Sequence, residues 1–193
     1  MIDKLIKNMK CNPAVTAVIF TSLKTSTVDI FVQKTIEKKN KIDWKRNNTF
    51  LIFGFFYQGI WQYYLFNKLM PRLLPGILNY SKKTLVEKIK DKQGIKNVFL
   101  QNFIENGLNN PFLFFPTFYL IQEIIQNKNI EECCKNAINK YYNNFWKDIT
   151  ACWILWIPAQ TINFAFSPKW FRVPFVAGVS ALWTGYVSYY RST

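Results

Sequence analysis

The sequence contains no histidine, and its 193 residues include only 11 acidic side chains against 25 basic ones. Without imidazole, the usual acid–base group of enzymes and the commonest metal ligand are both missing. The four cysteines form no C-x-x-C pair, and their positions are Cys11, Cys133, Cys134 and Cys152. There is also no glycine-rich phosphate loop, EF-hand or Walker motif. We therefore expect a protein that is not an enzyme and that binds neither a metal nor a cofactor, with its thiols reduced.

Ionised side chains are absent from three long stretches of the chain. None occurs between Arg46 and Lys68, between Asp148 and Lys169, or between Arg172 and Arg191. Each gap is about as long as the ~20 residues that cross a bilayer as a helix. The stretches therefore predict membrane-spanning helices.

The basic residues gather in the linkers between the apolar stretches, chiefly in residues 34–46 and 68–96. Loops of this kind lie at anionic membrane surfaces, so we expect a lipid bilayer with anionic lipids as a partner. Nucleic acid is not expected, because the aromatic residues, 18% of the chain, lie in the uncharged stretches. A base-stacking platform would place them among the basic residues.

These patterns predict an all-α integral membrane bundle that forms a single domain over residues 1–193. We expect four to five transmembrane helices and amphipathic surface helices. The expected spans cover about 13–33, 48–67, 97–125, 148–166 and 170–190, and the surface helices cover 1–10 and about 128–147. Lys24 and Asp29 interrupt the first span, so a peripheral amphipathic helix remains an alternative there. A tight turn at 167–169 is expected between the last two spans.

Glycine and proline indicate where these helices approach each other or bend. Gly54 and Gly59 in the second span would permit close contact with another helix. Gly107, Pro111 and Pro116 interrupt the third span and predict a kink. Glu105 and the asparagines that follow it lie on the amino side of this kink, where they would line a polar cavity or sit at the level of the lipid headgroups.

The two ends of the chain resemble the Mpv17/PMP22 family of membrane proteins. That family has Trp, Gln four residues later, Asn-Phe three beyond, then Pro, Arg and a final Trp-x-x-Tyr-x-Ser. The corresponding residues are Trp156, Gln160, Asn163, Phe164, Pro168, Arg172, Trp183, Tyr186 and Ser188. At the amino end, the family's Pro, Asp, Gln and Asp-x-x-Arg correspond to Pro13, Asp29, Gln33, Asp43 and Arg46. The middle helices depart from the family pattern, which indicates a divergent member.

The resemblance implies a small multi-helix protein of the mitochondrial inner membrane or, as the less favoured location, the peroxisomal membrane. It also implies a role in the passage of small solutes. We therefore expect a channel-like protein, and the alternative is a non-catalytic accessory subunit of a large mitochondrial membrane complex, such as a respiratory or ATP-synthase assembly. The second function would make other subunits of that complex its partners.

Six polar residues within the spans need partners, because a charge inside a membrane costs about 2.5–3.5 kcal/mol on insertion scales. They are Lys24, Asp29, Gln33, Gln160, Asn163 and Arg172. They would either line a wet pathway or form a polar clamp between helices, in which Asp29 and Gln33 bind the other end of the signature. For Trp156, Trp183 and Tyr186, packing or anchoring at the membrane interface is the expected role.

Overall fold

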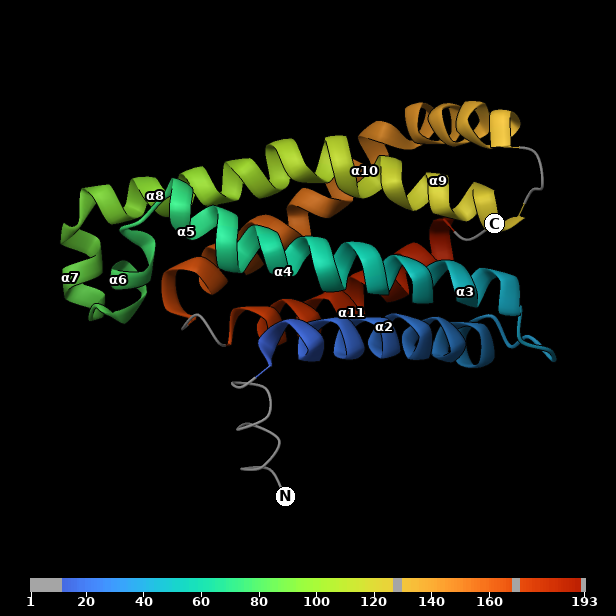
Figure 1. The fold of residues 1–193 in the computed structure, drawn as a ribbon, viewed down its shortest axis with the longest axis horizontal. Helices are drawn as coiled ribbons and strands as arrows, with labels where there is room; N and C mark the ends of the chain where they lie inside the picture. Colours follow the sequence, from blue (N-terminus) through green and yellow to red (C-terminus); the bar gives the residue numbers. More distant parts are fainter. Residues whose placement is uncertain (1–11, 127–129, 168–170, 192–193) are drawn as a thin grey trace, which may run out of the picture.

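The computed structural model describes residues 12–126, 130–167 and 171–191, and these residues form helices and no strand. Figure 1 shows long helices side by side in an elongated bundle, with short helices at one end. The expected all-α class is confirmed. The expected helix over residues 1–10 and most of the turn at 167–169 lie outside the described residues.

Five long helical runs make up the described part of the bundle, and several contain wide π-helical turns. The first run consists of α2 (Pro13–Phe31) and the π-helix η1 (Val32–Ile36). The second consists of α3 (Trp44–Phe53), η2 (Gly54–Trp61), α4 (Gln62–Tyr64), η3 (Leu65–Leu69) and α5 (Met70–Leu73). The short helices α6 (Ile77–Lys82) and α7 (Leu85–Lys90) follow. The third run consists of α8 (Lys92–Asn102), η4 (Phe103–Phe114) and α9 (Phe115–Gln126), and the last two runs are α10 (Ile130–Phe166) and α11 (Arg172–Arg191).

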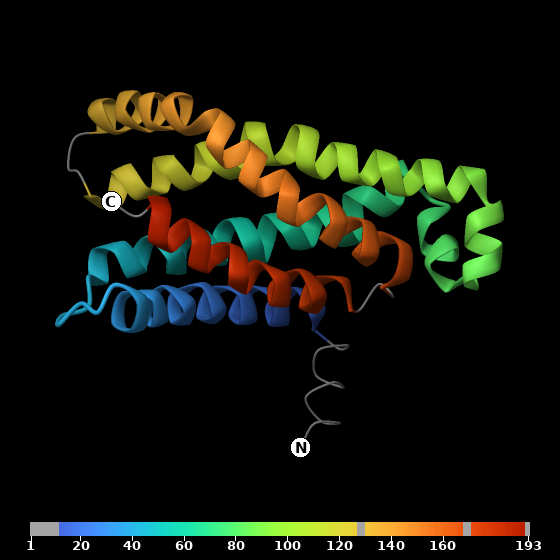
Figure 2. The ribbon, with the colours of Figure 1, turned by 180° about the vertical axis from the view of Figure 1, so that it is seen from behind.

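Helix α10 replaces two separate elements that the sequence predicted. The surface helix expected over 128–147 and the span expected over 148–166 form one continuous helix, α10, of 37 residues. Pro158 lies inside α10 and does not end it. Figure 2 shows that α10 changes direction along its length, so its first half lies on α9 and its second half crosses toward α8. The third expected span, over about 97–125, is helical throughout, and the wide turns of η4 accommodate Pro111, which lacks an N–H.

Helix α2 packs closely against η2, as the two glycines predicted. A Cβ atom at Gly54 would collide with the Thr25 hydroxyl and lie 2.9 Å from the carbonyl oxygen of Thr21. At Gly59 it would lie 2.7 Å from the Cα of Val18. The close approach also lets the Thr21 hydroxyl donate to the carbonyl oxygen of Gly54 over 2.9 Å. The glycines therefore bring the polar face of α2 against the second run.

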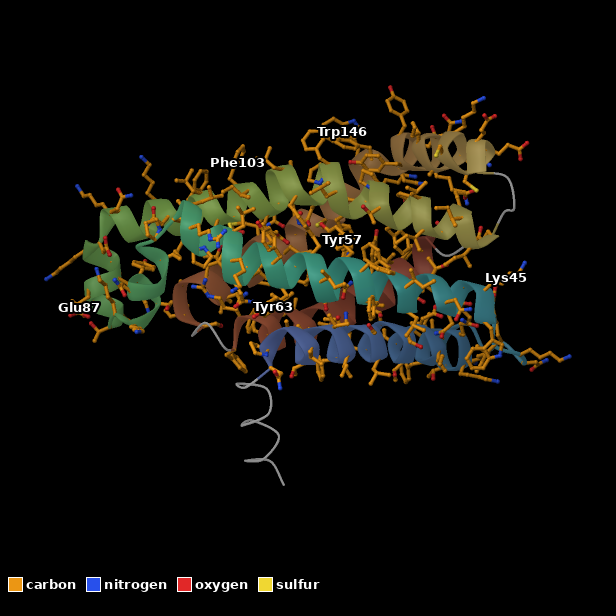
Figure 3. The ribbon with its side chains drawn as sticks, in the orientation of Figure 1. Lys45, Tyr57, Tyr63, Glu87, Phe103 and Trp146 are labelled. Atoms are coloured by element: carbon orange, nitrogen blue, oxygen red, sulfur yellow. The ribbon has the colours of Figure 1, made fainter. Side chains whose placement is uncertain are left out.

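The bundle has an unusually polar interior and an apolar exterior. Buried polar groups occur on all five long runs, whereas large apolar side chains such as Phe112, Trp146 and Ile154 are more than 70% exposed. Figure 3 shows Trp146 on the outer side of its helix. The interior also contains an aromatic core, in which Phe53 packs edge-on against both Phe114 and Phe118. Exposed apolar surface of this extent marks contact with lipid or another protein.

Length and hydropathy identify two helical stretches, among the described residues, that could cross a membrane. They are Pro13–Ile36, of 24 residues, and Glu131–Phe166, of 36 residues. About a third of the most apolar window is buried in each of them. The first stretch corresponds to the first expected span, and the second contains the fourth.

Candidate functional site

A buried ion pair between Asp29 and Arg46 joins α2 to α3. The Nε atom of Arg46 donates to Oδ1 of Asp29 over 2.8 Å, and the two side chains are 3% and 0% exposed. The Oδ2 atom of Asp29 accepts from Gln33 Nε2 at 2.8 Å and from Asn47 Nδ2 at 3.1 Å. The carboxylate is thus bound on both oxygens, which is the condition under which a buried charge is tolerated.

Ser188 connects this pair to the last helix, α11. Its hydroxyl donates to Oδ1 of Asp29 over 2.8 Å, and Nη2 of Arg46 donates to both the Oγ (2.6 Å) and the carbonyl oxygen (2.9 Å) of Ser188. Nη1 of Arg46 binds the carboxylate of Glu37 at 2.8 Å. Five residues therefore join three helices, and we call them the Asp29–Arg46 cluster: Asp29, Gln33, Arg46, Asn47 and Ser188.

Local sequence explains why Arg46 points into the cluster. Asp43 is the N-cap of α3, and its Oδ1 accepts from the backbone N–H of Arg46 at 3.0 Å. Gln33 fixes the preceding loop, because its Oε1 accepts from the N–H of Asp43 over 2.7 Å and its Nε2 donates to the Asp43 carbonyl. The Asp-x-x-Arg motif thus starts a helix and positions a guanidinium in its first turn.

Lys24 occupies a second polar position, near the middle of α2. Its Nζ donates to Gln58 Oε1 over 2.8 Å and to the hydroxyls of Ser180 (2.7 Å) and Thr184 (3.3 Å). All three acceptors are neutral, and within the described residues no carboxylate forms an ion pair with Lys24. Hydrogen bonds from neutral side chains therefore stabilise the ammonium group of this lysine, but no carboxylate among the described residues neutralises its charge.

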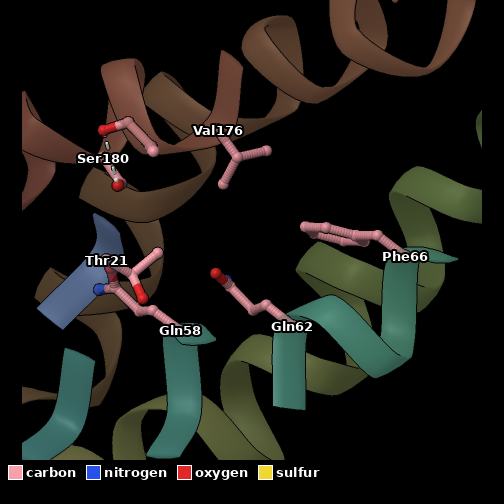
Figure 4. Close-up of a pocket in the computed structure, with 7 residues that line it drawn as sticks. Thr21, Gln58, Gln62, Phe66, Val176 and Ser180 are labelled. Atoms are coloured by element: carbon pink, nitrogen blue, oxygen red, sulfur yellow. Dashed lines mark hydrogen bonds between the residues drawn. The ribbon is translucent and has the colours of Figure 1, made fainter. Parts of the chain in front are cut away.

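A narrow space beside Lys24 runs between the second run and α11. Figure 4 shows Gln62 and Phe66 on one side of it and Val176 and Ser180 on the other, with Thr21 close by. The space leaves no room for a water molecule. In this conformation the polar interior is therefore closed.

Gln62 also borders a second small cavity, which Glu105 lines as well. This cavity has a volume of about 10 Å³, and Asn110 and Trp183 contribute to its wall. Such a volume is close to the minimum for one water molecule. The indole Nε1 of Trp183 is buried and has no hydrogen-bond partner among the described residues. The sequence left the position of Glu105 open, and the structure places it in the interior, 2% exposed.

The asparagines after Glu105 form a ladder along η4. Asn106 donates to Asn102 over 2.9 Å, and Asn110 donates to Asn106 over 3.1 Å. Asn109 donates to Glu105 over 3.2 Å and accepts from the indole of Trp61 at 2.8 Å. The ladder gives these polar groups hydrogen-bond partners along the helix, with Trp61 of η2 as a further partner, and keeps a polar edge along the third run.

The carboxyl-terminal polar residues lie apart from this arrangement, which corrects the clamp that the sequence predicted. Arg172 and Ser188 stand at opposite ends of α11, about 24 Å apart at 1.5 Å per residue. Arg172 donates to the carbonyl oxygens of Phe164 and Ser167, each at 3.4 Å, and Asn163 donates to Gln160 over 3.1 Å. The six predicted residues thus separate into three groups: Lys24 alone, Asp29 with Gln33, and Gln160 and Asn163 with Arg172 near the junction of α10 and α11. Arg172 stabilises the end of α10.

The aromatic residues of the signature pack in the interior. Phe164, Trp183 and Trp156 are 0%, 2% and 6% exposed. Trp183 stacks on Tyr186 with ring centroids 5.2 Å apart, and Phe164 meets Phe66 edge-on at 5.8 Å. Packing is therefore their role in this structure. Pro13 lies in the first turn of α2, and Pro168 is outside the described residues.

Sequence reasoning missed the neutral partners of Lys24 and Asp29. Asn47 and Gln58 carry no charge, and nothing in their neighbourhood distinguishes them from other polar residues. A signal did exist on α11, where Ser180, Thr184 and Ser188 recur every four residues and therefore share one helix face. Among the described residues, no group of three or more His, Cys, Asp or Glu side chains could hold a metal ion.

Comparison with known proteins gives matches of modest identity. Residues 124–188 match the Mpv17 / PMP22 family. The chain is 27% identical over 104 residues to Protein SYM1 of Mycosarcoma maydis, an alignment that covers 54% of this chain and 50% of that relative. It is 26% identical over 175 residues to Peroxisomal membrane protein 2 of Bos taurus, covering 87% of this chain and 78% of that one.

A third relative, the PXMP2/4 family protein 3 of Dictyostelium discoideum, is 26% identical over 183 residues, with 95% of this chain and 86% of the relative aligned. No solved structure matches. The family match covers the carboxyl-terminal signature, and the longer alignments extend to the residues of the Asp29–Arg46 cluster. By these matches the chain is similar to membrane proteins of the Mpv17/PMP22 family, and the model of that family covers its residues 124–188.

Proposed function

We propose that this protein is a channel-like, non-catalytic protein for small solutes in the mitochondrial inner membrane, crossing the membrane with four to five helices. The observation that carries the proposal is Lys24, a cation inside the bundle that binds only neutral groups. A charge at this depth is costly unless it has a function or a counter-ion. An unneutralised lysine between three helices suits the passage of anionic solutes.

The polar interior supports the same proposal. Gln62 borders both the narrow space beside Lys24 and the cavity at Glu105, so polar side chains continue from α2 to η4. The structure then corresponds to a closed state. Opening at this position requires that α11 move away from the second run and from α2, which breaks the contacts of Ser180 and Thr184 with Lys24.

The test is electrical. The purified protein is reconstituted into planar bilayers, and its reversal potential is measured in a gradient of potassium chloride. We expect conductance with a preference for chloride, and Lys24→Gln should move the reversal potential toward that of a non-selective pore. Lys45→Gln is the matched control, because Lys45 is exposed at the end of the bundle (Figure 3). Folded protein that gives no conductance, or a Lys24→Gln variant with unchanged selectivity, would contradict the proposal.

A second candidate function, an accessory subunit of a large mitochondrial membrane complex, is favoured by the first half of α10. Ile138, Tyr142 and Trp146 recur every four residues on one face and are 66%, 82% and 74% exposed. Such a stripe fits a partner subunit as well as lipid. Native gel electrophoresis of gently solubilised membranes separates the two functions. A band at the size of a respiratory complex favours the subunit, and a band near the monomer favours the channel.

A further inference from the structure

An open apolar groove lies between the third run and the second half of α10. Its volume is about 560 Å³. Aromatic and aliphatic side chains form both walls: Ile95, Phe99 and Phe103 from α8 and η4, and Trp153, Ile157 and Phe166 from α10. The volume lies within the range of about 300–1,000 Å³ that is typical of small-molecule sites, and is small for a helix about 10 Å across.

The groove offers apolar contacts and few free polar atoms. Asn102 in its wall already donates to Thr161 over 2.8 Å, and the indole of Trp153 donates to the carbonyl oxygen of Asn106 over 2.9 Å. Phe99 and Phe103 are nevertheless 68% and 52% exposed. A hydrocarbon chain would cover these rings without leaving a polar group unpaired.

One end of the groove is strongly basic. The segment 68–96, which carries eight Lys and Arg residues and two acidic ones, forms the short helices at this end (Figure 1). Nζ of Lys88 lies 4.5 Å from the centroid of the Phe166 ring, and no carboxylate forms an ion pair with it in the described part of the chain. Lys92 and Lys96 are exposed on α8, within one turn of Ile95.

We infer that this groove binds one anionic phospholipid, with an acyl chain between α8 and α10 and the phosphate at the basic end. The inference rests on the membrane location of the protein and on the pairing of an apolar groove with a basic end. It does not depend on conductance, because neither the narrow space beside Lys24 nor the cavity at Glu105 shares a lining residue with this groove.

Native mass spectrometry of the detergent-purified full chain provides the test. The probes are dioleoyl phosphatidylglycerol and dioleoyl phosphatidylcholine, which have the same chains and differ in headgroup charge. We expect one phosphatidylglycerol per protein. Ile157→Trp places a larger side chain in the groove and should weaken binding by more than about tenfold, because each buried CH₂ contributes ~0.8 kcal/mol. Ile154→Trp is the matched control, since Ile154 is 74% exposed on the same helix and does not line the groove.

A second pair of variants tests the headgroup. Lys92→Gln with Lys96→Gln should weaken phosphatidylglycerol binding about tenfold or more and leave phosphatidylcholine binding unchanged, because each nearby Lys contributes ~1 kcal/mol toward anionic lipid. Lys41→Gln with Lys45→Gln, exposed at the other end of the bundle, should have no effect. Equal binding of phosphatidylglycerol to Ile157→Trp and the unmodified chain would overturn the inference. The inference would also be overturned if the unmodified protein is a dimer and the Ile157→Trp variant is a monomer, because the groove would then hold a second copy of the chain.

Discussion

Asp29 and Arg46, 17 residues apart in the chain, form a buried ion pair in which Nε of Arg46 lies 2.8 Å from Oδ1 of Asp29. Ser188 of α11 binds both partners, so the pair fixes the relative positions of three helices. Because both groups are buried, the loss of Arg46 leaves the charge of Asp29 unpaired, and the loss of Asp29 leaves Arg46 with Glu37 as its remaining carboxylate partner. Four predictions follow from the contacts of individual residues in this bundle.

Asp29→Asn should lower the free energy of unfolding by about 3 kcal/mol, because buried Arg46 loses its fully buried carboxylate partner and keeps only Glu37, whose side chain is 15% exposed. Lys83→Gln is the control, since it breaks an exposed ion pair with Asp91, which contributes about 0–1 kcal/mol. The double variant Asp29→Leu with Arg46→Met should be less destabilised than the sum of its single changes. Unfolding in mild detergent measures the unmodified chain and all of these variants, including the single changes Asp29→Leu and Arg46→Met. Equal losses for Asp29→Asn and Lys83→Gln would show that the buried pair has no special role.

The sequence predicted most residues of the Asp29–Arg46 cluster, but it did not predict which of them pair with each other. The resemblance to the family identified Asp29, Gln33, Arg46 and Ser188 as a set of signature residues, and hydropathy placed them in or beside helices. Spacing along the chain does not say which helices are neighbours, however, so Arg172 was grouped with Asp29. The helix order in space decides the pairing, and it places Ser188, one end of α11, beside Arg46.

The continuity of α10 shows a second limit of the sequence. Residues 128–147 are amphipathic and 148–166 are apolar, so the change in composition indicated two elements. The backbone has no glycine or proline at this boundary to end a helix, and α10 continues through it. Composition reports what surrounds a helix and does not set where the helix ends.

Gly54→Ala should destabilise the protein by about 1–3 kcal/mol, the usual cost of overpacking. The added methyl group would meet the Thr25 hydroxyl and the backbone of Thr21 and Ser22 on α2, and backbone cannot move aside. Gly178→Ala is the matched control, because no atom lies within 4 Å of its new Cβ. That variant should gain about 0.5–1 kcal/mol, as alanine favours a helix interior. If both variants are equally stable, α2 and η2 do not pack as closely as described.

Acid should weaken the contact between Glu37 and Arg46. Partial burial raises the pKa of Glu37, but hydrogen bonds from Lys39 and Arg46 and their charges lower it more, so this pKa lies below its ordinary value of 4.5. A carboxyl whose pKa is lowered by folding stabilises the protein above its unfolded pKa. The stabilisation is lost as the pH falls through the lower folded value.

The Glu37→Gln variant isolates this effect. It should be less stable than the unmodified chain at pH 7, and the difference should shrink as the pH is lowered below about 4.5. Thermal unfolding in detergent between pH 3 and pH 7 measures it. A difference that stays constant over this range would mean that Glu37 does not contribute through its charge.

Arg172→Gln should lower stability without changing ion selectivity. The guanidinium is 0% exposed and binds two carbonyl oxygens at the end of α10, where a cation also interacts favourably with the helix dipole. We expect a loss of about 1–2 kcal/mol in the free energy of unfolding. Arg172→Lys should restore only part of this, because an ammonium group does not reproduce the planar fork of a guanidinium.

Lys24→Gln should differ from Arg172→Gln in its effect on ion selectivity. Lys24 and Arg172 were predicted to act together, either in a pathway or in a clamp, and the structure gives them different neighbours. If the channel proposal holds, Lys24→Gln shifts the reversal potential and Arg172→Gln does not. A shift of equal size for Arg172→Gln would place this arginine on the solute pathway, so its contact with the end of α10 would have to open when the channel conducts.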